Sequence, residues 1–447
     1  MNAFKAYDIR GIYGIDFTSD DCYRIGNNLP SLFSVKKILI GRDVRESSDE
    51  IFNNLARGIR DAGADVYDAG ITTTPQIYWS TEKFDFGLSV MITASHNPSK
   101  YNGMKISRKN ALPVGYDSGL KDLEDRLNQQ LLNTHEESGH IIPFNKSEDY
   151  FRFLATHRPE TGKLKIGIDC SNGMAGLYAR RLFGDGVLYI NENPDGNFPG
   201  HDPNPLEEEN QEAIKNLVKE NSLDIGVIFD GDADRVMFVD ENADFIRPDL
   251  MIAVLAHYFT DDKLNCKVLQ DIRTSKGVTE YLEKMGAEVH MWRVGRAYAA
   301  LKLREIDGLF GGELAGHYYF KDFNYSDSGI LACLMLLKVI ADFAEQGITL
   351  SKLISRIDVY ANSGELNFRI GKKQEAMDAI NKHFSSQEIP TAYYDFDGYR
   401  VEFSDWWYNI RPSNTEPYLR FLAEAKSTEL LRQKLETTRE ILKKFSN

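Results

Sequence analysis

Three acidic residues at alternating positions are the strongest chemical signal in the sequence. Asp230, Asp232 and Asp234 lie in the segment D-G-D-A-D-R, directly after an apolar stretch at 224–229 that reads as a strand. Carboxylates this close repel one another, and a hard divalent cation with oxygen ligands relieves the repulsion. Magnesium suits the pattern because it takes few protein ligands and pairs with a phosphate oxygen. The alternative is a capped acidic turn without an ion.

The same spacing occurs in EF-hand calcium loops, in which Glu241 would be the twelfth residue. Two features argue against an EF-hand. Arg235 stands where that loop needs glycine, and residues 236–239, V-M-F-V, predict a strand where a calcium loop is followed by a helix. We therefore predict that this turn binds magnesium.

A second loop, at 93–105, reads T-A-S-H-N-P-S-K-Y-N-G-M-K. It follows a predicted buried strand at 86–92, so Ser95 is expected at the edge of a sheet, where ligands bind in open α/β folds. A hydrolase nucleophile elbow is disfavoured because the serine lacks the flanking glycines of G-x-S-x-G. Taken alone, the segment is equally well an ordinary Ser/Asn/Pro turn. The metal and phosphate loops elsewhere favour a phosphoserine.

Two more loops carry polar groups suited to a phosphorylated sugar. In G-G-E-L-A-G-H, at 311–317, the Glu313 carboxylate can accept hydrogen bonds from vicinal hydroxyls, unless it is a solvated residue of a mobile turn. The segment R-P-S-N-T-E-P-Y-L-R, at 411–420, brings together two guanidinium groups, which bind phosphate in a bidentate manner. A solvated surface loop is the alternative for this segment.

The elements that position these loops repeat three times. Short strands that end in Asp are predicted at 37–43, 165–169 and 267–271. Each is followed by a helix and then by a strand that begins with glycine, predicted at 63–66, 184–187 and 286–289. A third strand follows later, predicted at 86–92, 225–229 and 308–310. The serine, aspartate and glutamate loops each follow a third strand, so three similar domains could point them into one cleft. Chance resemblance among α/β units is the alternative.

The predicted fold is therefore three similar mixed-sheet α/β domains plus a C-terminal α+β domain around a central cleft. We expect the domains at 1–145, 146–247, 248–358 and 359–447. In the last of these, Asp397-Gly398 predicts a hairpin, the phosphate loop joins two strands, and a helix at 429–445 ends the chain.

Composition limits the function classes. The 447 residues include 53 Lys plus Arg and 67 Asp plus Glu, a net charge of −14, which argues against nucleic-acid binding. The four cysteines lie far apart and form neither a zinc pattern nor a disulfide framework. The N-terminus has no apolar signal region, and the apolar stretch 330–343 is interrupted by charge and too short to span a bilayer. We expect a cytoplasmic protein without a membrane partner; its oligomeric state is left open.

Together these loops resemble the α-D-phosphohexomutase family, the phosphomannomutase/phosphoglucomutase type in particular. Five motifs occur in the family's order along essentially the whole chain: K-A-Y-D-I-R-G, T-A-S-H-N-P-x-x-Y-N-G-x-K, D-G-D-A-D-R, G-E-L-A-G-H and R-P-S-N-T-E-P. The resemblance implies a phosphoserine at Ser95 and Mg²⁺ held by its phosphate with Asp230, Asp232 and Asp234. It also implies hexose phosphates as substrates and a hexose 1,6-bisphosphate as intermediate and activator.

Other roles follow from the same resemblance. The catalytic centre would be lined by Tyr7, Arg10, His96, Lys105 and Arg235. The sugar would be contacted by Glu313 and His317, and the distal phosphate by Arg411, Ser413, Asn414, Thr415 and Arg420. Arg10, Lys105 and Arg235 would offset the charge that develops during phosphoryl transfer. Either Lys105 or His96 would remove the proton of the attacking hydroxyl.

Two departures from the motifs of this family bear on the identity of the sugar in the substrate. Ala315 stands where the family often has serine, and Arg296, expected among the substrate-binding residues, stands where many mannose/glucose members have histidine. Glucosamine members also differ at that position, but their sugar loop usually has a polar residue where this chain has Leu314, which favours mannose or glucose. The alternatives are a phosphoglucosamine mutase, a metal-dependent phosphatase and a catalytically silent sugar-phosphate-binding protein. The segment 195–199, D-G-N-F-P, is similar to a family stretch, but the sequence predicts no chemical role for it.

Overall fold

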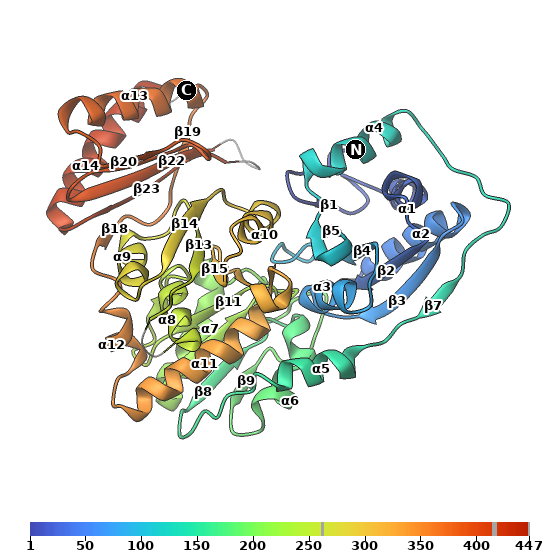
Figure 1. The fold of residues 1–447 in the computed structure, drawn as a ribbon, viewed down its shortest axis with the longest axis horizontal. Coiled ribbons are helices and arrows are strands. Elements are labelled where there is room, and N and C mark those ends of the chain that lie inside the picture. The colour runs from blue at the N-terminus through green and yellow to red at the C-terminus, as the bar shows by residue number, and fades with distance from the viewer. Residues whose placement is uncertain (261–262, 414–417, 446–447) are drawn as a thin grey trace.

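Four sheets follow one another along the part of the chain that the computed structural model describes, residues 1–260, 263–413 and 418–445. We call each sheet with its adjacent helices a domain. Figure 1 shows the first domain in blue at the right and the fourth in red at the upper left, with the second and third between them. The predicted fold class, three α/β domains followed by an α+β domain, is confirmed.

The sheet of the first domain has the order β1-β5-β4-β2-β3-β7, with β6 paired to β5. Its strands are β1 (Ile9–Ile12), β2 (Lys37–Arg42), β3 (Asp65–Ile71), β4 (Leu88–Ile92), β5 (Tyr101–Arg108), β6 (Leu112–Pro113) and β7 (Ile141–Pro143). Its helices are α1 (Ser19–Phe33), α2 (Ser48–Asp61), α3 (Thr74–Lys83) and α4 (Leu120–Asn128).

The second sheet has the order β12-β11-β10-β8-β9. It consists of β8 (Ile166–Asp169), β9 (Leu188–Ile190), β10 (Ile225–Phe229), β11 (Val236–Val239) and β12 (Phe245–Ile246), with helices α5 (Ser147–Ala155), α6 (Ala179–Phe183) and α7 (Glu208–Asn221). The strand at 236–239 that argued against an EF-hand is thus present.

The third sheet has the order β14-β13-β15-β16-β17. It consists of β13 (Lys267–Asp271), β14 (Glu288–Trp292), β15 (Phe310–Gly312), β16 (Tyr318–Phe320) and β17 (Ser326–Asp327), with helices α8 (Leu250–Phe259), α9 (Lys276–Lys284), α10 (Arg296–Glu305), α11 (Gly329–Glu345) and α12 (Leu350–Ile354).

The threefold repeat is present in the pairing of the strands. In each of the first three sheets, the first strand of the repeat pairs in parallel with the second and the third: β2 with β3 and β4, β8 with β9 and β10, β13 with β14 and β15. An antiparallel strand then follows the third one. The serine, aspartate and glutamate loops therefore occupy equivalent turns, those before β5, β11 and β16.

The glycine-led strands were predicted too early. β3, β9 and β14 begin two to four residues after the glycines that were expected to lead them. These residues, Gly63, Gly184 and Gly286, have φ of 79°, 81° and 91°, which glycine adopts without strain. They end the preceding helices, and the extended chain starts only after them.

The fourth sheet is antiparallel, in the order β18-β23-β22-β21-β20 with β19 paired to β23. It consists of β18 (Ala361–Asn362), β19 (Leu366–Arg369), β20 (Ala392–Tyr394), β21 (Tyr399–Glu402), β22 (Trp406–Pro412) and β23 (Tyr418–Ala425), with helices α13 (Lys373–Gln387) and α14 (Thr428–Leu442). The predicted hairpin joins β20 and β21.

The second and third domains share one hydrophobic core. Phe229 of β10, Phe310 of β15 and Leu334 of α11 are buried in it. The first and fourth domains have cores of their own, although Tyr78 of α3 also enters the shared core. The apolar stretch 330–343 lies in α11, most of whose apolar side chains are buried in the shared core. No helix in the described part of the chain is long and apolar enough to cross a lipid bilayer.

Candidate active site

Ser95 lies in the turn between β4 and β5 and is buried. Its Oγ donates to Asp230 Oδ2 at 2.9 Å and lies 3.3 Å from His96 Nδ1. Gly231 permits this close approach of two domains, because a Cβ at that position would lie 2.5 Å from the Ser95 carbonyl oxygen. The serine loop and the acidic turn are therefore in direct contact.

The acidic turn has the donor set that a divalent cation takes. Asp230, Asp232 and Asp234 are buried, and one carboxylate oxygen of each lies within 4.8 Å of the others. Among the described residues, Asp232 Oδ1 and Asp234 Oδ1 have no hydrogen-bond partner although both atoms are buried. Buried carboxylate oxygens that accept no hydrogen bond are costly, so these residues fit a hard cation such as magnesium.

The three carboxylates differ in their charge environment. Burial, together with repulsion from Asp234 and Asp232, raises the pKa of Asp230 well above its usual range. Burial acts on Asp234 in the same direction, but Lys105 and His317 outweigh it and hold the pKa of Asp234 well below its usual range.

Lys105, on β5, supplies positive charge to the same turn. Its Nζ donates to Asp232 Oδ2 at 2.6 Å and to Asp234 Oδ2. Burial alone would lower the pKa of Lys105, but the two carboxylates more than offset it and raise the pKa above its usual value. The ammonium group is therefore charged at neutral pH. Asp232 is also bonded by Thr74, at the start of α3, whose Oγ1 donates to Oδ2 at 2.5 Å.

The loop of the third domain joins the acidic turn through His317. A β-bridge pairs Arg235 with His317, and the histidine Nε2 lies 3.5 Å from Asp234 Oδ1. Its Nδ1 is 2.9 Å from Glu313 Oε2. Burial and Arg235 oppose protonation, whereas Asp234 and Glu313 favour it, and the pKa of His317 is raised to about 9.

Glu313 is enclosed by protein, so the solvated carboxylate considered from the sequence does not describe it. Its Oε1 accepts from the backbone N–H of Gly295 at 2.6 Å, and its Oε2 accepts from the Tyr319 hydroxyl at 2.9 Å. Burial alone would raise the pKa of Glu313, but the bonds from His317 and Gly295 lower it to about 2. The carboxylate is ionised and aligned by its neighbours.

The remaining N-terminal candidates surround the serine loop. Arg10 Nη1 donates to Asn97 Oδ1 at 2.8 Å, and its Nη2 donates to Asp8. Tyr7 donates its hydroxyl to the Val294 carbonyl at 3.0 Å, which links the first domain to the third. Burial and the charges of Arg235 and Arg10 lower the pKa of His96 well below its ordinary value, so its imidazole is neutral.

Arg296 begins α10 and faces the first domain. Its Nε donates to Asp327 Oδ1 at 2.8 Å, and its guanidinium carbon lies 3.6 Å from the centre of the Tyr78 ring. Asp327, which the sequence did not single out, is buried, and Asp327, Asp234 and His317 each place a ligand atom within 4.8 Å of the others. Asp327 thus belongs to the polar cluster of the site.

The phosphate loop of the fourth domain joins β22 to β23. Arg411 and Arg420 are directly opposite each other in this antiparallel pair, so their side chains share one face of the sheet. Arg411 Nε donates to Asp397 Oδ1 at 3.2 Å, and the other oxygen of Asp397 accepts from the Val294 N–H at 2.9 Å. The Ser413 N–H donates to the Tyr418 carbonyl at 2.9 Å. Asn414 and Thr415 lie outside the described residues.

Glu365, before β19, connects this loop to the third domain. Its Oε1 lies 3.0 Å from Arg420 Nη1, and its Oε2 lies 3.6 Å from Nη1 of Arg273, an arginine that follows β13. Neither Glu365 nor Arg273 belongs to a motif singled out in the sequence. Two cations from different domains thus meet one carboxylate.

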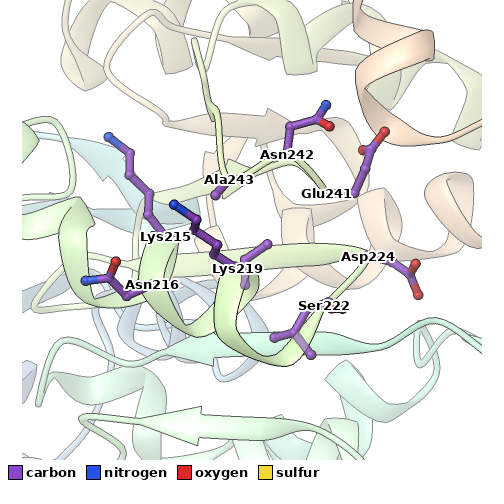
Figure 2. A pocket seen from close by; sticks show the side chains of 10 residues that line it. Lys215, Asn216, Lys219, Ser222, Asp224, Glu241, Asn242 and Ala243 are labelled. Carbon is purple, nitrogen blue, oxygen red and sulfur yellow. The ribbon is translucent and has the colours of Figure 1, made fainter.

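An open hollow of about 560 Å³ on the second domain contains none of these residues. Figure 2 shows the amino groups of Lys215 and Lys219, on α7, at one side and the carboxylates of Asp224 and Glu241 at the other. Glu241 accepts from the Ser351 hydroxyl at 2.5 Å. The groups do not converge, so this hollow is not a candidate site.

The sequence matches known families in four consecutive parts. Residues 1–133, 148–243 and 247–360 match "Phosphoglucomutase/phosphomannomutase, alpha/beta/alpha domain" I, II and III, and residues 365–441 match the C-terminal domain of the same family.

Similar proteins cover the whole chain. A phosphomannomutase of Methanocaldococcus jannaschii is 36% identical over 100% of this chain and 98% of its own length. A phosphomannomutase of Vibrio cholerae is 33% identical over 100% and 99%. A crystal structure of a phosphoglucomutase/phosphomannomutase family protein from Burkholderia thailandensis superposes with a TM-score of 0.87 at 28% identity, over 99% of this chain and 97% of that one.

Proposed function

The chain belongs to the phosphoglucomutase/phosphomannomutase family, and from this premise we propose that it interconverts the 6-phosphate and the 1-phosphate of mannose or glucose. The reaction would proceed through a phosphorylated Ser95 and a bound hexose 1,6-bisphosphate. The observation that supports this most is the 2.9 Å contact between Ser95 Oγ and Asp230 Oδ2, beside the buried Asp232 Oδ1, which has no hydrogen-bond partner among the described residues.

In the first step a free hydroxyl of the hexose phosphate attacks the phosphorus on Ser95. The bond from phosphorus to Ser95 Oγ breaks as the bond to the sugar oxygen forms, and the product is the 1,6-bisphosphate. This intermediate then reorients in the site. Ser95 Oγ bonds to the phosphorus of the other phosphoryl group as the bond from that phosphorus to its sugar oxygen breaks, and the sugar oxygen takes back a proton as a hydroxyl. When bound by Asp230, Asp232 and Asp234, Mg²⁺ would stabilise the negative charge on the transferring group.

The charge on each remaining residue of the site indicates its role in the reaction. Lys105 stays protonated between two carboxylates, so it offsets charge rather than accepts a proton. His96 is neutral and lies beside Ser95 Oγ, which makes it the better of the two candidates for the general base. Arg10 and Arg235 add positive charge around the serine loop, and Glu313 with His317 would bind the sugar hydroxyls.

A parallel assay tests this proposal. Mannose, glucose and glucosamine 1-phosphates are each supplied with Mg²⁺ and the matching 1,6-bisphosphate, and the 6-phosphates formed are measured. We expect turnover of mannose and glucose phosphates to exceed that of the glucosamine compound. A preference for glucosamine would favour the alternative mutase, release of inorganic phosphate would indicate a phosphatase, and binding without conversion would indicate a catalytically silent protein.

Replacement of Arg420 by alanine should weaken substrate binding. A charge-assisted bond to phosphate contributes about 1.5–3 kcal/mol, so we expect R420A to raise KM for hexose phosphates about 10- to 100-fold with a smaller change in kcat. Steady-state kinetics of R420A and of R432A, an exposed arginine on α14 of the same domain, measure the difference. A change confined to kcat would assign Arg420 a different role.

Replacement of Glu365 by glutamine should have the opposite effect. The carboxylate pairs with Arg420 and faces Arg273, so a substrate phosphate that binds Arg420 must compete with it. The pair is partly exposed, which limits its strength to about 1 kcal/mol, and E365Q should lower KM by roughly two- to fivefold. The control is E375Q, an exposed glutamate on α13. A higher KM in E365Q would show that the carboxylate supports the arginine instead.

A further inference from the structure

We propose that Arg45 is a positioning residue for the Ser95 loop and that the segment 195–199 of the second domain, D-G-N-F-P, holds Arg45 in place. The inference rests on the phosphoserine role proposed for Ser95. It gives a function to a segment for which the sequence predicted no chemical role.

Arg45 lies between β2 and α2 and is buried, yet it bonds almost entirely to backbone oxygens of the serine loop. Its Nε donates to Asp43 Oδ2 at 3.0 Å, and Asp43 is held in turn by the Ser48 hydroxyl at 2.7 Å. The two terminal nitrogens donate to four carbonyl oxygens, those of Ser95 at 2.8 Å, Asn97 at 2.6 Å, Pro98 at 2.8 Å and Tyr101 at 3.0 Å. One side chain therefore fixes the whole turn between β4 and β5.

The bond to the Ser95 carbonyl matters because the serine backbone is strained. Its φ is 51°, in the left-handed region, which a residue other than glycine keeps only when its surroundings enforce it. By holding the peptide that follows Ser95, Arg45 sets the direction of the Cα–Cβ bond. That direction brings Oγ to Asp230. Phosphoryl transfer depends on such alignment, and a misplacement of about 1 Å costs roughly 100-fold in rate.

The second domain closes over the guanidinium. The Phe198 ring is buried, and its centre lies 4.9 Å from the guanidinium carbon of Arg45. Gly196 comes so near that a Cβ there would lie 2.8 Å from the Arg45 Cα. Asn197 Nδ2 donates to Glu46 Oε1 at 3.0 Å. An aromatic face against a desolvated guanidinium is an attractive contact, so the position of Arg45 depends on the docking of the second domain.

These hydrogen bonds require the planar guanidinium group of an arginine. The guanidinium reaches four carbonyls and a carboxylate at once, whereas the ammonium of lysine is a single point with three donors. We therefore expect R45K to fold with a loosened serine loop. The groups proposed to bind the hexose phosphate, Glu313, His317, Arg411 and Arg420, lie in the third and fourth domains, so its affinity should change little.

The decisive measurement is the rate at which dephosphorylated protein takes up a phosphoryl group from hexose 1,6-bisphosphate, followed by quenched intact-mass analysis. We expect R45K to slow this uptake and kcat about 100-fold with little change in KM. A merely structural role would lower the melting temperature without slowing uptake in the folded protein. The control is R57K, since Arg57 also stacks on an aromatic ring, that of Tyr23, on the exposed side of α2.

A second pair of variants decides the matter if R45K does not fold. F198L keeps apolar volume but loses the aromatic face, and F198Y keeps the face. We expect F198L to slow uptake about tenfold and F198Y to restore it. Equal rates in F198L, F198Y and the unmodified protein would refute the inference, as would an unaltered rate in folded R45K. An unmodified protein that takes up no phosphoryl group would instead refute the phosphoserine function itself.

Discussion

Replacement of Ser95 by alanine is expected to abolish turnover and to remove the phosphoryl adduct. Ser95 Oγ is the atom proposed to carry the phosphoryl group, and the loss of a covalent nucleophile costs at least roughly 10⁴-fold in kcat. Intact-mass measurement after incubation with hexose 1,6-bisphosphate should show the added phosphoryl group in the unmodified protein and no addition in S95A. Steady-state assays of the same samples measure the activity.

The neighbouring Ser99 provides the control. It lies in the same turn but is exposed, so S99A should retain both the adduct and the activity. An S95A protein that turns over hexose phosphates at the normal rate would contradict the phosphoserine mechanism. An adduct that persists in S95A would show that another side chain is phosphorylated.

Replacement of Asp232 by asparagine should have the second-largest effect. The carboxylate has one buried oxygen without a partner among the described residues, and its other oxygen accepts from Lys105 and Thr74. Loss of its charge would weaken metal binding, which contributes several kcal/mol to transition-state stabilisation. We expect kcat to fall about 100- to 1,000-fold. This factor should exceed the factor by which KM rises.

Two measurements check this expectation. Magnesium titration by calorimetry should show weaker binding in D232N, and kinetics at saturating Mg²⁺ should show the loss in kcat. D244N serves as the control, because Asp244 is an exposed carboxylate in the turn between β11 and β12 of the same domain. An unchanged kcat in D232N would contradict the assignment of Asp232 as a metal ligand.

The sequence was sufficient for features that depend on short-range order. Alternation of apolar strands with helices predicted the fold class, and the common position of the three loops predicted that they would meet. The spacing of Asp230, Asp232 and Asp234 after a buried strand predicted a compact group of carboxylates, because residues at alternate positions in a tight turn remain neighbours whatever the rest of the chain does.

Contacts between residues far apart in the sequence were beyond such reasoning. Thr74, Arg45 and Glu365 belong to unremarkable segments, and each acquires its role only because a partner 50 or more positions away in sequence is brought beside it. Glu313 illustrates the same limit. Its loop reads as glycine-rich and solvated, yet Gly295 and Tyr319 enclose the carboxylate. Arg296 likewise pairs with Asp327 across the domain, which no local pattern announces.

The first and fourth domains differ in how they contact the core shared by the second and third. The first domain inserts Tyr78 into the core shared by the second and third, whereas none of the described residues of the fourth domain is among the buried members of that core. Displacing the first domain would expose a buried aromatic ring, at a cost of roughly 2 kcal/mol or more. Among the described residues, the fourth domain contacts the third mainly through polar groups, such as Asp397 with Val294 and the buried Arg400 with the carbonyl oxygens of Ile272 and Thr274, beside one aromatic pair, Trp292 with Phe396. We therefore expect the domain that carries Ser95 to stay in place, and the fourth domain, with the arginines proposed to bind the distal phosphate, to move more readily.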